Sequence, residues 1–307
     1  MASRTASLTA SVSNSSLTRW LLNAVLAGLA RLGPTGRARA GRLLGRLYYQ
    51  FAKRSRAVTY ANLRTCFPVA QPAELAQRTR ASMHSAAALI PEVAYCWKGP
   101  MDGWRGLIHS VKGVEPIGAE LAAGRGVLAL GPHLGNWELL NLYMGAEFGM
   151  VALYDPPKIS AIEELIRAAR ERTNSQLLPI TPAGLRALLR HLRNGGLSGL
   201  LPDQVPDPAA GVYADFFARP ALTMTFASRL IASEQTKVFV AAAIRNAQGG
   251  FDIEFEEVTA ALRADSQRAS CEAMNRVVEE MILRAPEQYQ WSYKRFKRPP
   301  PGYDTIY

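Results

Sequence analysis

The spacing of apolar residues changes along the chain and divides it into two regions. Residues 17–108 read as helical and include the nearly unbroken apolar run WLLNAVLAGLA at residues 20–30. From about Gly126 onward, short apolar runs alternate with longer amphipathic stretches. The short runs predict strands, and the amphipathic stretches predict helices.

In the second region the predicted strands and helices follow one another in turn. Strands are predicted at residues 126–131, 150–154, 176–180, 197–203, 237–244 and 250–258. Helices are predicted at residues 136–149, 160–172, 181–196, 222–233 and 266–283. This alternation predicts an α/β fold with a mostly parallel central sheet flanked by helices. Functional residues of such folds lie in loops at the carboxyl ends of the strands.

The same patterns predict three segments. Residues 1–16 are rich in Ser, Thr and Ala and are expected to be disordered. Residues 17–108 are expected to form a helical, basic N-terminal region that contains a membrane-associating segment. Residues 109–307 are expected to form the α/β domain.

The positive charge of the chain is concentrated near its N-terminus. The formal net charge is +11, from 36 Lys and Arg against 25 Asp and Glu. The segment before Glu74 holds 11 of the basic residues and no acidic residue, so the rest of the chain is balanced. A one-sided basic segment is typical of a surface that binds the phosphates of nucleic acid or of anionic lipid.

Apolar and aromatic residues lie among these arginines, which favours lipid as the partner. The interleaved residues are Leu43, Leu44, Leu47, Tyr48, Tyr49 and Phe51. The run at residues 20–30 is shorter than the ~20 residues that span a bilayer unless flanking residues snorkel. We therefore expect a segment that lies on the membrane or marginally spans it; the alternative is a solvated basic helix packed on the domain. No nucleic-acid-binding pattern is present, so no nucleic acid partner is predicted.

The stretch GPHLGNWELL, residues 131–140, follows the first predicted strand and contains one of only four histidines. In a continuous helix, His133 and Glu138 would point ~140° apart and could not meet. Gly135 permits a bend, and Asn136 is a favoured helix cap, so His133 is expected in the loop and Glu138 in the first turn. We predict that Glu138 then orients His133 as a general base.

The chemistry around this pair points to an external hydroxyl as the nucleophile. The stretch contains no Ser or Cys, and the chain has no GxSxG motif. The alternatives are a loop histidine that only packs and a Glu placed favourably in a helical first turn. Cys66, Cys96 and Cys271 neither pair by spacing nor cluster with histidines, so no disulfide and no metal site are predicted and a reducing compartment fits best.

GPHLGNWE resembles the His-x4-Asp/Glu box of the glycerolipid acyltransferase superfamily. More narrowly, the chain is similar to the lipid A late acyltransferases (lauroyl/myristoyl type) of Gram-negative bacteria. The further similar stretches, in family order, are ANLRTCFP at 61–68, LYDPPK with AARERTNSQLLP at 153–179, the long block at 200–231, and APEQYQWSYKRFKRPPPG at 285–302. The resemblance runs from about residue 17 to the end, and several blocks in order are more specific than the box alone.

The resemblance implies transfer of a fatty acyl chain from acyl carrier protein to a hydroxyl of a lipid A precursor, on a 3-hydroxyacyl chain. It implies that His133 deprotonates this hydroxyl, that Glu138 orients His133, and that no cofactor is needed. It also implies work at the cytoplasmic face of the inner membrane, as a peripheral protein or with a single N-terminal anchor. Residues 109–307 would be the acyltransferase domain.

Substrate-binding residues are also carried over by the resemblance. Arg170 and Arg172 lie in the block where the family places arginines for phosphate or acceptor binding; the alternative is a solvated helix end. The family often has Arg where this chain has Asp155, and Lys158 is expected to take over that contact.

Asp203, Arg219 and Thr223 lie in the central block and are expected to bind substrate or shape the site, although Asp before a turn is also ordinary structure. Trp137 and Trp291 are expected to line an acyl groove or to pack in the core. A second basic patch could bind acyl carrier protein or lipid phosphates, and it consists of Lys294, Arg295, Lys297 and Arg298.

Two other functions fit parts of the sequence. An acyltransferase of the same superfamily acting on another glycolipid, a phospholipid or an aryl-polyene acceptor would use the same His and Glu. A non-catalytic membrane-binding protein would have no use for the pair.

Overall fold

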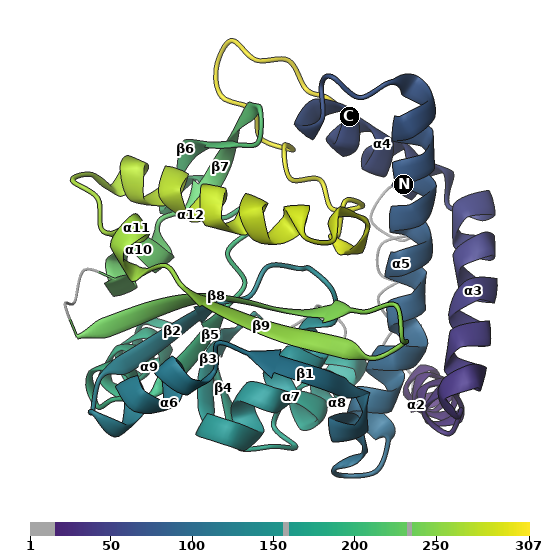
Figure 1. Ribbon diagram of the computed structural model, residues 1–307, viewed down its shortest axis with the longest axis horizontal. Coiled ribbons are helices and arrows are strands. Elements are labelled where there is room, and N and C mark those ends of the chain that lie inside the picture. The colour runs from purple at the N-terminus through teal and green to yellow at the C-terminus, as the bar shows by residue number, and fades with distance from the viewer. Residues whose placement is uncertain (1–15, 156–159, 232–234) are drawn as a thin grey trace, which may run out of the picture.

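The computed structural model describes residues 16–155, 160–231 and 235–307 and has an α/β architecture (Figure 1). Within these residues a seven-stranded sheet has the order β1-β9-β8-β2-β5-β3-β4. Its strands are β1 (Ile108–Lys112), β2 (Gly126–Leu130), β3 (Met150–Tyr154), β4 (Ser175–Pro179), β5 (Leu197–Leu200), β8 (Thr236–Arg245) and β9 (Phe251–Glu257). Strands β2, β3, β4, β5 and β8 are parallel, and β9 runs antiparallel to β8. The predicted mostly parallel sheet flanked by helices is therefore confirmed.

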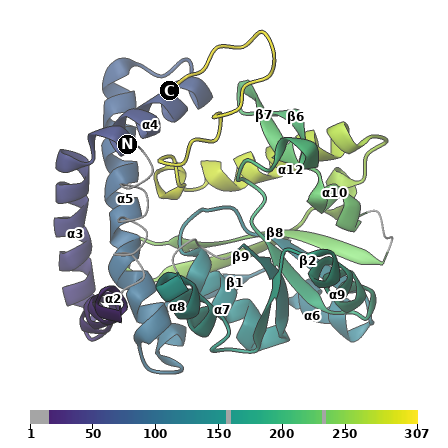
Figure 2. The same ribbon diagram turned by 180° about the vertical axis from the view of Figure 1, so that it is seen from behind.

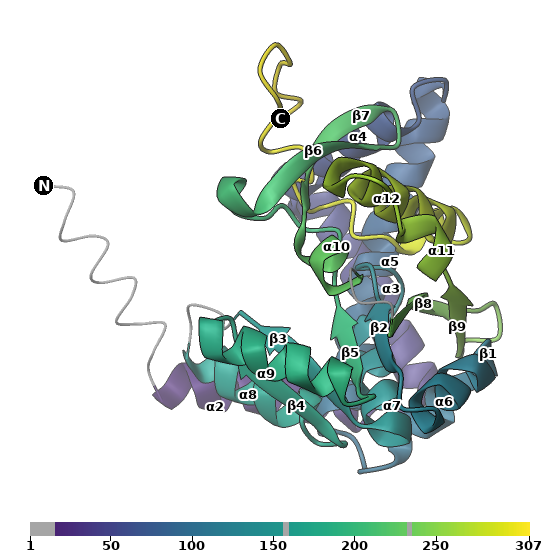
Figure 3. The ribbon, with the colours of Figure 1, turned by 90° about the vertical axis from the view of Figure 1, so that its left-hand side faces the viewer.

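Helices cover both faces of this sheet (Figure 3). One face carries α6 (Glu115–Ala122) and α7 (Trp137–Phe148), and the other carries α9 (Pro182–Arg193), α10 (Phe226–Ile231), α11 (Thr259–Leu262) and α12 (Gln267–Leu283). Strand β2 is buried along its whole length, because Val127 and Ala129 pack on the first face and Leu128 and Leu130 on the second. Helix α8 (Ser160–Arg170) lies beside α7 and β4.

The N-terminal region is helical, as the sequence indicates. It contains α2 (Ser16–Ala30), α3 (Pro34–Phe51), α4 (Lys53–Cys66) and α5 (Pro72–Lys98), and α3 lies along α5 at the edge of the molecule (Figures 1 and 2). Gly41 and Gly45 allow this close approach, because a Cβ atom on either would stand 3.1 Å from the α5 backbone.

None of the helices within the described ranges is long and apolar enough to cross a membrane. The predicted disorder of residues 1–16 concerns residues 1–15, which lie outside the described ranges, and Ser16, which begins α2.

Some elements differ from the secondary structure that the pattern predicts. The helix predicted at 222–233 begins only at Phe226, because residues 219–224 form β7 and pair antiparallel with β6 (Gly211–Phe216). This hairpin buries Phe216 and Ala221 against α12, so tertiary packing overrides the local helical pattern. Strand β1 was not predicted, because it is a short edge strand with partly exposed side chains.

Candidate active site

His133 lies in the loop after β2, and the pairing of β2 with β5 determines what stands beside it. The two strands are parallel, and Leu130 at the end of β2 pairs with Leu200 at the end of β5. His133 is three residues past Leu130, and Asp203 is three residues past Leu200. The two side chains therefore meet at the carboxyl edge of the sheet, where α/β folds place their functional residues.

Asp203 holds His133 by two hydrogen bonds. Its Oδ1 atom lies 2.8 Å from Nδ1 of the ring, and its Oδ2 atom accepts the backbone N–H of His133 at 3.0 Å. Burial raises the pKa of the Asp203 carboxyl, but attraction to His133 and these hydrogen bonds outweigh burial, so its pKa lies below the ordinary value. An ionised Asp203 fixes the ring with its proton on Nδ1.

The second ring nitrogen of His133 faces the exposed side chain of Gln204. The Nε2 atoms of the two residues are 3.2 Å apart. Because Nδ1 carries the ring proton, Nε2 keeps a lone pair and accepts a hydrogen bond from the Gln204 amide. The nitrogen that can take a proton from a substrate is thus directed toward the open side of the site.

The loop that carries His133 is held by strand β8 and by the segment after α12. Gly135 has φ +60°, and a Cβ atom there would meet the carbonyl oxygen of Ala243 at 2.0 Å. Asn136 donates its backbone N–H to that oxygen at 2.8 Å, and Gln290 donates its own to the carbonyl of His133 at 3.0 Å. The bend predicted at Gly135 is present, and Asn136 caps α7 by accepting the Leu139 N–H at 3.0 Å.

Glu138 does not hydrogen-bond His133, which corrects the predicted His–Glu pairing. Its carboxylate accepts hydrogen bonds from Arg170, the shortest at 2.6 Å, and from Nε1 of Trp97 at 3.0 Å. The reason is helical geometry. Successive residues of a helix point ~100° apart. Trp137 faces the His133 ring at 5.1 Å between centroids, so Glu138 is turned to another side of α7.

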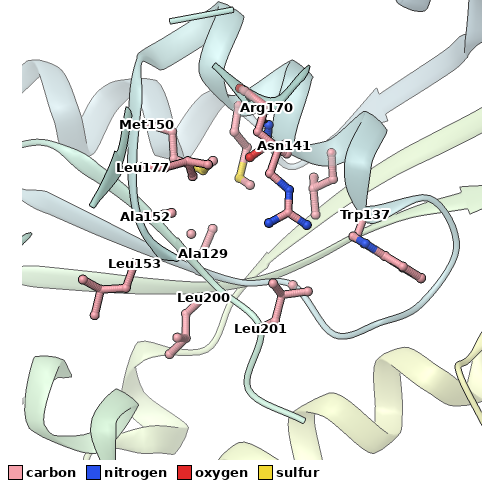
Figure 4. A pocket seen from close by; sticks show the side chains of 14 residues that line it. Ala129, Trp137, Asn141, Met150, Ala152, Leu153, Arg170, Leu177, Leu200 and Leu201 are labelled. Atoms are coloured by element: carbon pink, nitrogen blue, oxygen red, sulfur yellow. Dashed lines mark hydrogen bonds between the residues drawn. The ribbon is translucent and has the colours of Figure 1, made fainter. Parts of the chain in front are cut away.

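Arg170 lies on the wall of a small apolar cavity (Figure 4). The cavity has a volume of about 80 Å³ and is lined by residues of α7, β2, β3 and β5. Burial lowers the pKa of Arg170, but the ion pair with Glu138 more than compensates, so its pKa lies above the usual value and the guanidinium stays charged. In Figure 4 this guanidinium points into the space between Trp137 and the aliphatic side chains.

The other predicted binding residues lie elsewhere. Arg172 donates to the carbonyl oxygens of Cys96 and Gly99 at 2.6 and 3.0 Å, and so caps the C-terminal end of α5. Arg219 and Thr223 lie on β7, where Arg219 donates to a carbonyl of the C-terminal tail and Thr223 is fully buried. Lys158 lies outside the described residues.

One residue of the basic patch predicted near the C-terminus is buried in the core. Arg295 is 2% exposed and donates to the Leu222 carbonyl at 2.6 Å and to Thr223 Oγ1 at 2.9 Å. Lys297 and Arg298 are exposed and Lys294 is partly exposed.

Sequence reasoning missed the role of Trp97 and the contacts that Asp203 and Gln204 make with His133. The sequence signal for these contacts is that the LPDQ stretch at residues 201–204 lies at the end of a predicted strand, as the stretch around His133 does. Across the described ranges, no group of three or more His, Cys, Asp or Glu side chains is placed to hold a metal ion.

Comparison of the sequence with known proteins gives a family and several relatives. The sequence pattern described as bacterial lipid A biosynthesis acyltransferase matches residues 7–298. The chain is similar to the lipid A biosynthesis lauroyltransferase of Escherichia coli (strain K12), with 28% identity over 88% of each chain. It is also similar to the lipid A biosynthesis palmitoleoyltransferase of that strain, with 27% identity over 87% of each chain. The lipid A biosynthesis myristoyltransferase of the same strain is 27% identical, over 92% of this chain and 88% of its own.

Proposed function

Because this chain belongs to the bacterial lipid A biosynthesis acyltransferase family, we propose that it transfers a fatty acyl chain from an acyl carrier protein thioester to a hydroxyl of a lipid A precursor. The observation that carries the proposal is the buried Asp203–His133 pair, with Nε2 of His133 directed toward the open side of the site.

In the proposed reaction the acceptor hydroxyl takes the place of the Gln204 amide at Nε2 of His133. Nε2 accepts the hydroxyl proton while the hydroxyl oxygen attacks the thioester carbonyl carbon, forming the new C–O bond. The C–S bond then breaks, and the carrier thiolate leaves and receives the proton from the imidazolium. Asp203 stabilises that imidazolium and keeps its orientation. A thioester is already activated, so a positioned base supplies most of the chemistry required.

Arg170 is assigned to substrate binding in this proposal, and Glu138 is assigned to holding Arg170 in place. Arg170 presents a charged guanidinium at the cavity wall, where it can bind an anionic oxygen of the acceptor. Glu138 is a positioning residue, because its carboxylate fixes the guanidinium from the opposite side.

We assign the outer side of α2 and α3 to an anionic membrane surface, at the cytoplasmic face of the inner membrane. On α3, Leu43, Leu47 and Phe51 repeat at intervals of four residues and are 56%, 44% and 74% exposed. On α2, Trp20 and Val25 are 65% and 58% exposed. Exposed arginines flank this apolar strip, and each adds roughly 1 kcal/mol of attraction to an anionic leaflet.

The experiment incubates the purified protein with an acyl carrier protein thioester and a phosphorylated lipid A precursor, and follows the mass gain of one acyl chain. His133→Ala should lower the transfer rate by roughly 10²- to 10⁴-fold. Wild-type rates in that variant would remove His133 as the base. A phospholipid acceptor run in parallel tests the other acceptor class, and a coenzyme A thioester tests the dependence on the carrier protein.

A further inference from the structure

A second and larger cavity lies on the other side of Trp137. This apolar groove has a volume of about 650 Å³ and is bounded by α2, α3, α5 and the segment at residues 288–292. Its walls are almost entirely aliphatic and aromatic, with Leu26, Leu44, Leu47, Ile90, Val93 and Trp97 among them. A groove of this size and composition suits a hydrocarbon chain.

The groove comes close to the candidate base through two residues that contact it. Trp137 forms part of its wall, and the ring of Trp137 contacts the ring of His133. Gln290 also lines the groove and donates its backbone N–H to the carbonyl of His133. Trp137 lines the small cavity next to Arg170 as well, so one indole ring separates the two apolar spaces.

The outer end of the groove opens onto the apolar strip of α3. Leu47 and Ile90 line the groove and are also 44% and 47% exposed. Leu47 is the middle residue of the exposed set on α3, and the neighbouring Arg42 and Arg46 are exposed to solvent. Apolar side chains edged by guanidinium groups complement a molecule with both hydrocarbon and phosphate, which is the chemistry of a bilayer lipid.

We propose that this groove binds the hydrocarbon chain of the acceptor, the chain that carries the reacting hydroxyl. The inference rests on the proposed function. A hydroxyl within a hydrocarbon chain cannot reach His133 unless the rest of that chain passes beside the base, and the groove provides an apolar path that starts at Trp137, whose ring contacts His133. The acceptor chain moves into it from the bilayer, whereas the donor is delivered by a soluble protein and binds outside the groove.

The test narrows the groove without touching the base. Ala86 on α5 lines the groove, so Ala86→Phe should fill part of it. Ala81, an exposed residue of the same helix outside the groove, provides the matched control Ala81→Phe. Val93→Phe fills the groove from another position and replaces Ala86→Phe if that variant does not fold.

Each variant is assayed with two acceptors that share a phosphorylated disaccharide and differ only in their acyl chains, one with long 3-hydroxyacyl chains and one with 3-hydroxybutanoyl chains. Each methylene that is excluded from the groove weakens binding roughly fourfold. Exclusion of about three methylenes should therefore raise KM for the long-chain acceptor on the order of 50-fold. In the groove variants we expect kcat/KM for the short-chain acceptor and KM for the donor to change less than about twofold. The control Ala81→Phe should leave these two values and KM for the long-chain acceptor unchanged.

Three results would overturn the inference. An equal loss with both acceptors would mean that the substitution acts through the base. A rise in donor KM that grows with donor chain length would assign the groove to the donor, and unchanged kinetics would show that no chain enters it. Failure of the wild-type protein to acylate either acceptor would instead refute the proposed function, and it is visible before any variant is made.

Discussion

Nδ1 of His133 lies 2.8 Å from Oδ1 of Asp203, and the 70 positions between these residues equal the register offset between β2 and β5. The side chains meet because each chain segment continues for the same distance past a pair of matched strand ends. Any shift of one strand against the other would separate the carboxylate from the imidazole, since a parallel ladder moves by whole residues.

Asp203→Asn tests this pair directly. The amide keeps the size of the side chain but removes the negative charge that stabilises the imidazolium in the transition state. We expect kcat to fall by about 10²- to 10⁴-fold with a smaller change in acceptor KM. Steady-state acyl transfer, measured beside thermal unfolding of the same preparation, separates catalysis from folding. A variant with near-wild-type kcat would mean that another group orients His133.

Glu138 and Arg170 should behave as a second, independent pair. The side chains of Glu138 and Arg170 are 5% and 20% exposed, so removing either partner leaves a largely buried charge unpaired. Glu138→Gln and Arg170→Gln, alone and together, should give a coupling free energy of unfolding of about 1–3 kcal/mol. The corresponding cycle of Glu138→Gln with Asp203→Asn should be additive within about 0.5 kcal/mol. Strong coupling in that second cycle would restore a direct link between Glu138 and the His133–Asp203 pair.

Gly135→Ala should disrupt the loop that presents His133. The methyl group would overlap sterically with the carbonyl oxygen of Ala243, and the positive φ would add backbone strain. We expect the free energy of unfolding to fall by more than about 3 kcal/mol, with loss of acyl transfer. Gly118→Ala in α6 is the control, because a Cβ atom there meets nothing within 4 Å. The control should gain up to about 1 kcal/mol in urea unfolding. Equal stability of the two variants would show that the loop can relax.

Glu279 should make stability depend on pH in the opposite sense to a salt-bridged acid. Burial raises its pKa above the usual 4.5, although a hydrogen bond from the Phe217 N–H at 2.7 Å partly offsets this. The folded protein therefore binds the proton more tightly than the unfolded chain. The contribution of this proton to the free energy of unfolding is fully present below about pH 4.5 and is lost as the pH rises through the raised pKa.

Glu279→Gln keeps an oxygen that can accept the Phe217 N–H but cannot ionise. Compared with the wild type, the variant should be more stable at pH 7 and should lose that advantage near pH 4.5. Urea unfolding at the two pH values measures the difference. An advantage that stays constant with pH would indicate a packing effect.

The place of His133 in a loop between a buried strand and a helix could be predicted because strong local signals surround it. A fully buried strand, a glycine bend and an asparagine cap all lie within ten residues, and the structure contains each of them. Asp203 was recognised as a strand-end residue, but its pairing depends on β5 lying next to β2, and strand order is set by tertiary packing. The position of Glu138 follows from the angle between successive helical residues, which places Trp137 on the His133 side.

The same contrast holds for the fold. The strands that carry continuous apolar runs were predicted, whereas β7 was read as helix and β1 was missed. Both are strands whose pairing partner, more than their own pattern, makes them strands. The substrate role expected of Arg172 also shows the limit of position alone, because its guanidinium is occupied with backbone carbonyls of α5.

The hydrogen bonds from the segment after α12 to the His133 loop have a consequence for the timing of biosynthesis. Gln290 binds the carbonyl of His133, and Gln288 accepts the N–H of Gly135, although both follow every strand of the sheet in sequence. During translation, every strand of the sheet is therefore synthesised before the residues that make these two contacts. The final shape of the loop that carries His133 therefore depends on residues that are translated after the whole sheet.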